Sequence, residues 1–168
     1  MKHKTKFLHC GDNLKDGLSA NLDEIFFVIN SIRWKPEFSF TEDGRTFKYQ
    51  TGYNRAFNAV FKKLGWEVKP LLRDKPRLVG DFRKELIFGE IQFGNSSTLY
   101  RDYYKFQYGL QSGLLSLAVL IVPTKPAQFF PTRLIRSVHN MAEYDLALRY
   151  FTILPIAVPT LIIGLEPD

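Results

Sequence analysis

Several residue types on which proteins build stabilising or metal sites are scarce in this sequence. It contains one cysteine, Cys10, so it can form neither an internal disulfide nor a cysteine-based zinc cluster. Its histidines are His3, His9 and His139, and their spacing matches no metal-ligand motif. These absences exclude a disulfide framework and the common zinc folds.

Internal repeats, low-complexity tracts and long apolar runs are also absent. The longest apolar run, residues 114–122, is too short to cross a bilayer. The N-terminal segment is basic but lacks the apolar region of a signal peptide. We therefore expect a cytoplasmic protein with no membrane partner.

The length of 168 residues suits one domain with a real hydrophobic core, so we expect residues 1–168 to form a single domain. Lysine and arginine number 23 against 17 aspartate and glutamate residues, which gives a net charge of +6. This excess is a mild bias toward polyanionic partners such as nucleic acids.

Apolar residues at helical spacing predict four helices. These cover residues 17–33, residues 53–64, the segment from Ser97 to Gly113, and residues 138–151. Asp16 or Ser19 is expected to cap the first helix and Ser97 the third. Gly65 is expected to end the second helix.

The remaining apolar segments predict strands. These cover residues 66–68, 86–93, 114–122 and 156–165, and a hairpin is expected to turn at residues 42–44. Residues 6–10 are either a short edge strand or a mobile end. Strand 86–93, the helix after it and strand 114–122 form a βαβ crossover, so the sheet should be mixed. Pro159 favours a sheet edge for the last strand. Phe129 and Phe130 are predicted to be exposed in a loop.

The stretch from Asp81 to Gln92 carries the strongest chemical signal in the chain. Glu90 lies inside a predicted strand of β-branched and aromatic residues, where it shares one face with Gln92. Asp81 ends the short apolar segment 78–80, and the polar residues 83–85 are predicted to turn the chain. If the two segments pair as antiparallel strands, the carboxylates of Asp81 and Glu90 meet.

Two carboxylates at one point repel each other unless a cation lies between them, and oxygen ligands suit Mg²⁺ better than zinc. Such an ion, completed by water and a phosphate, is an arrangement that cleaves phosphodiesters. The alternative is a charged hairpin with a solvated face. The metal site is favoured because an unpaired charge at Glu90, inside an apolar strand, would be costly.

These motifs resemble a known nuclease core. The matching segments are Gly80-Asp81, Glu90-Ile91-Gln92-Phe93-Gly94-Asn95 and Arg101-Asp102-Tyr103-Tyr104-Lys105-Phe106-Gln107. They are similar to the PD-(D/E)XK nucleases and, more narrowly, to the BglII/BstYI group of type II restriction endonucleases, in which glutamine stands in the usual lysine place. The resemblance implies an α/β (α+β) fold with a restriction-endonuclease-like core, a mixed central β-sheet flanked by helices. The core would span about residues 53–122, after a helical part at about 14–52 and before a C-terminal helix and strand at about 136–165.

The resemblance also implies roles for individual residues. Asp81 and Glu90 would bind the metal with the Ile91 carbonyl as a further ligand, and Gln92 would hold the attacking water. Asp81, Glu90 and Gln92 are thus the expected catalytic residues, with Mg²⁺ as cofactor, Mn²⁺ as a substitute, and no organic cofactor. Contacts to DNA are expected from Asn95, Ser96, Ser97, Lys105, Arg133, Arg136, His139 and Asn140, with Lys105 on the polar face of its helix.

The resulting prediction is a Mg²⁺-dependent, sequence-specific endonuclease that cuts double-stranded DNA. We expect a homodimer, because a twofold axis presents one active site to each strand of a palindrome. Two alternatives stay open. One is a repair or structure-selective nuclease on the same core, and the other is a DNA-binding protein whose catalytic site has degenerated at Gln92.

Overall fold

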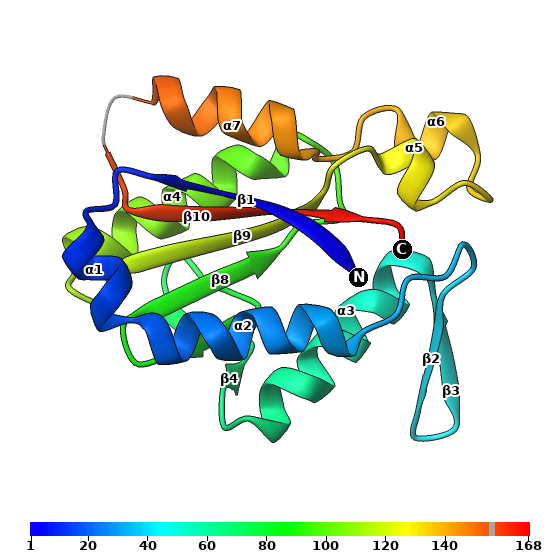
Figure 1. Cartoon of the computed structure of the whole chain (residues 1–168), viewed down its shortest axis with the longest axis horizontal. Coiled ribbons are helices and arrows are strands. Elements are labelled where there is room, and N and C mark those ends of the chain that lie inside the picture. The colour runs from blue at the N-terminus through cyan, green and yellow to red at the C-terminus, as the bar shows by residue number, and fades with distance from the viewer. Residues whose placement is uncertain (155–156) are drawn as a thin grey trace.

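The computed structural model describes residues 1–154 and 157–168, and its centre is a six-stranded sheet in the order β1-β10-β9-β8-β7-β4 (Figure 1). The strands are β1 (Lys2–Leu8), β4 (Glu67–Val68), β7 (Phe82–Lys84), β8 (Ile87–Ile91), β9 (Leu117–Pro123) and β10 (Thr160–Glu166). The pairs β8–β9 and β9–β10 are parallel, whereas the other neighbours are antiparallel. The expected mixed sheet is confirmed.

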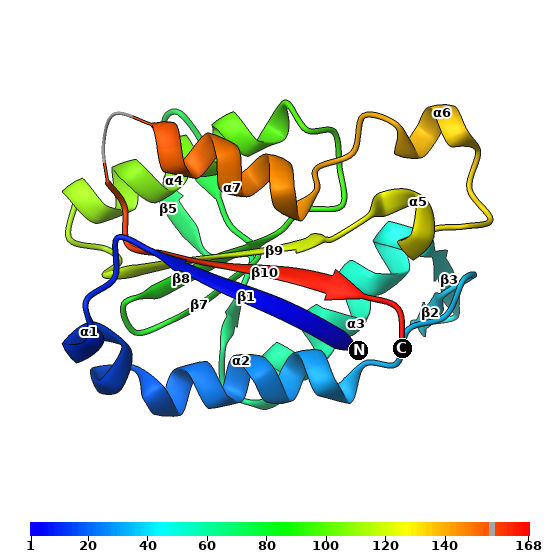
Figure 2. The ribbon, with the colours of Figure 1, turned by 45° about the horizontal axis from the view of Figure 1, so that its top comes forward.

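Helices cover both faces of this sheet (Figure 2). One layer contains α2 (Ser19–Ser31) and α3 (Tyr49–Lys63), and the other contains α4 (Thr98–Gln111) and α7 (Tyr144–Ile153). Helix α4 connects β8 to the parallel strand β9, all seven residues of which are buried. The βαβ crossover predicted from the continuous apolar run is therefore confirmed.

The alternation of β8 assigns its residues to the two layers. Ile87 and Ile91 pack in the cluster that includes the apolar faces of α2 and α3. Phe88 packs in the second cluster, with apolar residues of α4 and α7. Because side chains alternate along a strand, Glu90 shares the face of Phe88 and is directed toward α4.

The smaller elements lie around this framework. They are α1 (Asp12–Gly17), the hairpin β2 (Ser39–Glu42) and β3 (Arg45–Lys48), the pair β5 (Leu71–Arg73) and β6 (Leu78–Val79), α5 (Pro126–Phe129) and α6 (Ile135–Val138). The predicted hairpin turn is confirmed, and Gly65, with φ of +79°, follows α3 as expected. Within the described residues, none of the helices has the length and apolar character needed to cross a membrane.

Two helix predictions were wrong in detail. The predicted helix 17–33 corresponds to α2, which begins at Ser19, and residues 12–17 before it form the separate helix α1. Leu18 occupies the N-cap of α2, so neither Asp16 nor Ser19 caps it. The last helix begins at Tyr144 instead of residue 138. The residues before it pair with the loop after β8, where Ala142 N–H donates to Gly94 O at 2.9 Å, and this pairing holds them out of the helix.

Three predictions about strands and loops were also wrong. Phe129 and Phe130 are buried in a cluster of aromatic rings, because α5 turns them inward from the predicted loop. Strand β10 is central, between β1 and β9, since Pro159 precedes its first residue and removes no ladder hydrogen bond. Ile156, predicted in this strand, lies outside the described residues. The turn predicted at 83–85 is displaced, because β7 runs to Lys84 and the chain turns at Glu85 and Leu86.

Candidate active site

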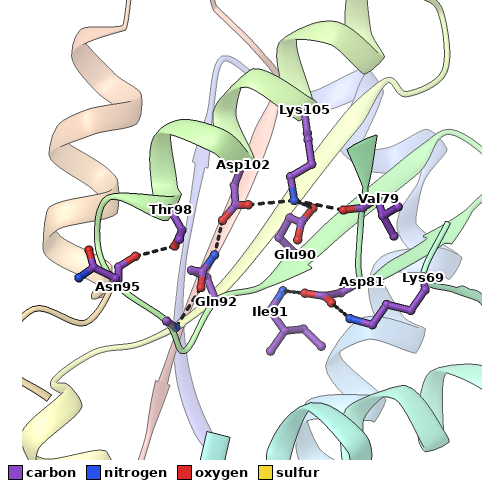
Figure 3. Close-up of polar contacts among 11 residues, drawn as sticks. Lys69, Val79, Asp81, Glu90, Ile91, Gln92, Asn95, Thr98, Asp102 and Lys105 are labelled. Atoms are coloured by element: carbon purple, nitrogen blue, oxygen red, sulfur yellow. Dashed lines mark hydrogen bonds and ion pairs between the residues drawn. The ribbon is translucent and has the colours of Figure 1, made fainter. Parts of the chain in front are cut away.

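Asp81 and Glu90 meet where β7 and β8 pair. Asp81 N–H donates to Gly89 O at 3.0 Å, which continues the antiparallel register by one residue beyond Phe82. The Asp81 carboxylate reaches across the strand pair, and its Oδ2 accepts the Ile91 N–H at 2.8 Å (Figure 3). The structure therefore brings together the two carboxylates that the sequence pattern paired.

Two glycines allow this close approach of the strands. A Cβ atom at Gly80 would lie 2.2 Å from Phe88 Cζ, and one at Gly89 would lie 2.0 Å from Phe82 Cζ. Each phenylalanine ring thus occupies the space that a side chain on the opposite segment would need. The two reciprocal glycine–phenylalanine contacts fix how Asp81 and Glu90 are presented.

Glu90 belongs to a buried charged cluster with α4. Lys105 donates to Glu90 Oε1, forms an ion pair with Asp102 Oδ1 at 3.0 Å and donates to Val79 O at 3.2 Å. Burial, followed by the charges of Asp81 and Asp102, raises the pKa of Glu90 well above its ordinary value, while Lys105 acts in the opposite direction. The prediction that Lys105 lies on the polar face of its helix is wrong, because its side chain is buried inside the candidate site.

Gln92 lies next to this cluster with both ends of its amide bound. Its Nε2 donates to Asp102 Oδ2 at 2.6 Å, and its Oε1 accepts the Gly94 N–H at 2.9 Å. It shares the α4-facing side of the strand with Glu90, as the alternation predicted (Figure 3). Asp102 connects Gln92 to the charged cluster, since its carboxylate contacts both Gln92 and Lys105.

A second lysine, which the sequence pattern did not indicate, contacts the other carboxylate. Lys69, between β4 and β5, forms an ion pair with Asp81 Oδ1. Lys69 also has a φ of +58°, a left-handed conformation that is uncommon for residues other than glycine. This backbone conformation is the one local feature that marks the residue, and it cannot be read from sequence.

The residues Asp81 and Glu90 line a cleft with a volume of about 450 Å³. It is lined by the site residues Asp81, Glu90, Ile91, Gln92, Lys69 and Lys105 and by Asn54, Arg77 and Arg101. Its cationic side chains suit a phosphate. Among the described residues, no group of three or more histidine, cysteine, aspartate or glutamate side chains is placed to hold a metal. Two carboxylates are nevertheless a fitting donor set for Mg²⁺, which keeps several waters and takes substrate phosphates as ligands.

The two loops predicted to contact DNA lie side by side. Ser96 N–H donates to Asn140 O at 2.8 Å, and Asn95 forms a β-bridge with Met141. One pocket is lined by Asn95, Arg133, Arg136 and Asn140, and a second by Ser96, His139 and Asn140. Ser97 occupies the N-cap position of α4, but its side chain forms no capping hydrogen bond. Lys105 is the one predicted DNA contact that lies apart from these loops, in the carboxylate cluster.

Known proteins share this architecture and sequence pattern. A family model described as restriction endonuclease BglII/BglIII matches residues 3–165. Nine chains among the solved structures match, including one described as the crystal structure of restriction endonuclease BglII complexed with a DNA 16-mer. The match covers 100% of the present chain and 78% of that one, with a TM-score of 0.76 and 17% identity, and at this identity it establishes the fold. No curated protein sequence matches the chain.

Proposed function

The chain belongs to the BglII/BglIII family of restriction endonucleases, and we propose that Asp81 and Glu90 hold the metal ion with which it cuts DNA. As a member of this family it is a sequence-specific, metal-dependent endodeoxyribonuclease. Mg²⁺ is the proposed ion, with Mn²⁺ as a substitute, because a pair of carboxylates with water suits a hard cation. The observation that carries the proposal is the meeting of Asp81 with Glu90 across one strand pair, with Asp81 fixed by the Ile91 N–H.

The remaining residues of the cleft have roles that follow from their hydrogen bonds. A divalent ion bound beside Ile91 would supply a water of lowered pKa and offset the charge of the phosphate. Asp102 and the Gly94 N–H hold the amide of Gln92, and the second lone pair of Oε1 can accept a hydrogen bond from the attacking water. Asp102 is therefore a positioning residue for Gln92.

The loops beside the cleft are the proposed DNA-reading surface. Arginine can bind guanine with two hydrogen bonds and asparagine can bind adenine in the same way, so Arg136 and Asn140 are suited to contact base edges. Asn95 O accepts the Thr98 N–H at 3.0 Å, and Asn95 Oδ1 accepts the Ser97 N–H at 2.9 Å, which orders this segment. Ser96, Ser97, Arg133 and His139 complete the proposed surface.

We propose that the enzyme is a homodimer, with residues 1–168 of each copy as one nuclease domain. An apolar patch on α4 and α7, defined here by the exposed Tyr100, Tyr104 and Ile153 and the half-buried Tyr150, suits an isologous contact. Tyr100 and Tyr150 stack within it, with their ring centroids 5.0 Å apart. The proposed location is the cytoplasm, because Cys10 is a free thiol and the substrate is DNA.

Cleavage of plasmid and genomic DNA with Mg²⁺ tests the function. Discrete fragments that disappear with EDTA are expected. Smears or nicks would instead indicate a repair or structure-selective nuclease, and a mobility shift without cleavage would indicate a degenerate DNA-binding protein. Asp81→Ala and Glu90→Ala should each abolish cleavage but bind DNA in Ca²⁺. A double variant that still cuts would place the active site elsewhere.

A further inference from the structure

The candidate site needs positive charge beside the scissile phosphate, which the amide of Gln92 does not supply. Negative charge spreads over the phosphate oxygens during phosphoryl transfer, and preorganised cations beside them are the usual source of stabilisation. Gln92 is neutral. We propose that Lys69 is a further catalytic residue, which neutralises Asp81 in the metal-free protein and contacts the scissile phosphate once a metal ion occupies that carboxylate. This inference rests on the function proposed above for Asp81 and Glu90.

The backbone around Lys69 is held in a costly conformation. Its φ of +58° is left-handed, and the residue before a proline such as Pro70 is normally extended. Such a conformation persists when the surroundings fix it, and it is concentrated at functional sites. Here Lys69 N–H donates to Asp81 O and Gly80 N–H donates to Pro70 O, both at 3.0 Å. The segment is thus joined to the Asp81 strand on both sides, and the Lys69 side chain is directed onto the carboxylate (Figure 3).

The two lysines of the cleft differ in their freedom to move. The Lys105 side chain is 4% exposed, and its ammonium donates to Glu90 and to the Val79 carbonyl and forms an ion pair with Asp102. The Lys69 side chain is 54% exposed. Within the described residues, its ammonium contacts Asp81 Oδ1. Lys69 can therefore turn into the cleft, whereas Lys105 is fixed.

A metal ion bound to Asp81 would displace the Lys69 ammonium from that carboxylate. Asp81 Oδ2 is bound by the Ile91 N–H, so Oδ1, which Lys69 occupies, is the oxygen that an incoming ion would take. A divalent ion there repels the ammonium, as any two cations at one carboxylate do. Arg77 and Arg101 line the same cleft and offer no anion. The nearest new anion for the displaced ammonium is the phosphate of bound DNA.

Two measurements on Lys69→Met separate this role from that of a passive counter-ion. The first is the affinity of the DNA-free protein for Ca²⁺ by calorimetry, which should rise several-fold because no ammonium competes for Asp81. The second is the single-turnover cleavage rate at saturating Mg²⁺, which should fall by about a hundredfold. Lys69→Arg, which keeps the charge, should retain more of the rate than Lys69→Met. Lys6→Met removes the same charge from the far edge strand β1 and should change neither quantity.

Each contrary result identifies a different error. Tighter Ca²⁺ binding with an unchanged cleavage rate would make Lys69 a counter-ion and overturn the inference. Weaker Ca²⁺ binding together with a lower unfolding midpoint would make its role structural, with the same consequence. Asp81→Ala is measured in parallel. If it still cuts DNA, the proposed active site is itself wrong, and if it is inactive while Lys69→Met cuts normally, the Lys69 inference alone fails.

Discussion

At the residue scale, Glu90 has a cation and a neutral amide beside it, Lys105 and Gln92. Lys105 brings a positive charge to Glu90 from α4, and Gln92 brings a neutral amide that is held by Asp102 and Gly94. The charge and the hydrogen-bonding group therefore come from different elements. A substitution that places both functions at position 92 would duplicate the charge beside Lys105.

We expect Gln92→Lys to reduce activity by about tenfold or more and to raise the Mg²⁺ requirement. The added ammonium cannot accept the Gly94 N–H, and it would lie on the same side as Glu90 and Lys105, where it repels an incoming metal. Titration of the cleavage rate with Mg²⁺ measures both effects. Gln111→Lys, on the exposed end of α4, is the matched control.

Faster cutting by the Gln92→Lys variant at every Mg²⁺ concentration would contradict this expectation. Position 92 would then be a decayed catalytic site, and the DNA-binding alternative would gain support.

The raised pKa of Glu90 predicts a pH-dependent metal requirement. Burial and the carboxylates of Asp81 and Asp102 keep the protonated form of Glu90 present at higher pH than for an ordinary glutamate. A metal binds the deprotonated form, so protons compete with it. The Mg²⁺ concentration for half-maximal cleavage should therefore rise as the pH is lowered through this raised pKa. Metal titrations at several pH values measure it, and a requirement independent of pH would show that Glu90 is not a ligand.

At the scale of elements, the sequence correctly predicted the features that depend on local patterns of apolar residues. The β8–α4–β9 crossover and the shared face of Glu90 and Gln92 follow from the apolar run and the two-residue repeat. The errors concern elements whose state depends on distant partners. Phe129 and Phe130 are buried because their rings pack on Tyr53 and Phe93, which are distant in sequence, and on each other.

Arg133, in the loop after α5, and Arg136, in α6, should behave differently when changed to alanine. Arg136 is exposed and lines the pocket with Asn95 and Asn140, so Arg136→Ala should relax the site preference at a cost of about 1–3 kcal/mol. Arg133 donates to Gln50 Oε1 at 2.8 Å and lies over the Tyr49 ring, so Arg133→Ala should instead weaken binding to all sequences. Competition binding with different DNA sequences measures both. A uniform loss for Arg136→Ala, with a shallower salt dependence, would assign Arg136 to the phosphate backbone.

At the scale of the whole molecule, the site is assembled from segments that no local pattern connects. Asp81 and Glu90 are neighbours through one hairpin, and their pairing was predictable from the sequence. Lys69 contacts Asp81 from the loop before β5. Asp102 lies in α4, on a stretch whose sequence is largely polar, and contacts Lys105. The charges that surround the carboxylates therefore depend on tertiary packing, and the sequence alone could not reveal them.

The exposed patch on α4 and α7 predicts how the whole enzyme assembles. Tyr104→Glu places a charge in the patch and should convert the proposed dimer to a monomer, which light scattering after gel filtration measures. Because one monomer carries one active site, double-strand cuts should give way to nicks or to loss of cleavage. Phe27→Glu introduces the same charge at an exposed aromatic residue of α2, in the opposite helix layer, and should leave the dimer intact. A dimer that resists Tyr104→Glu but is broken by Phe27→Glu would move the interface to the α2 side, where the twofold axis would relate the two clefts differently.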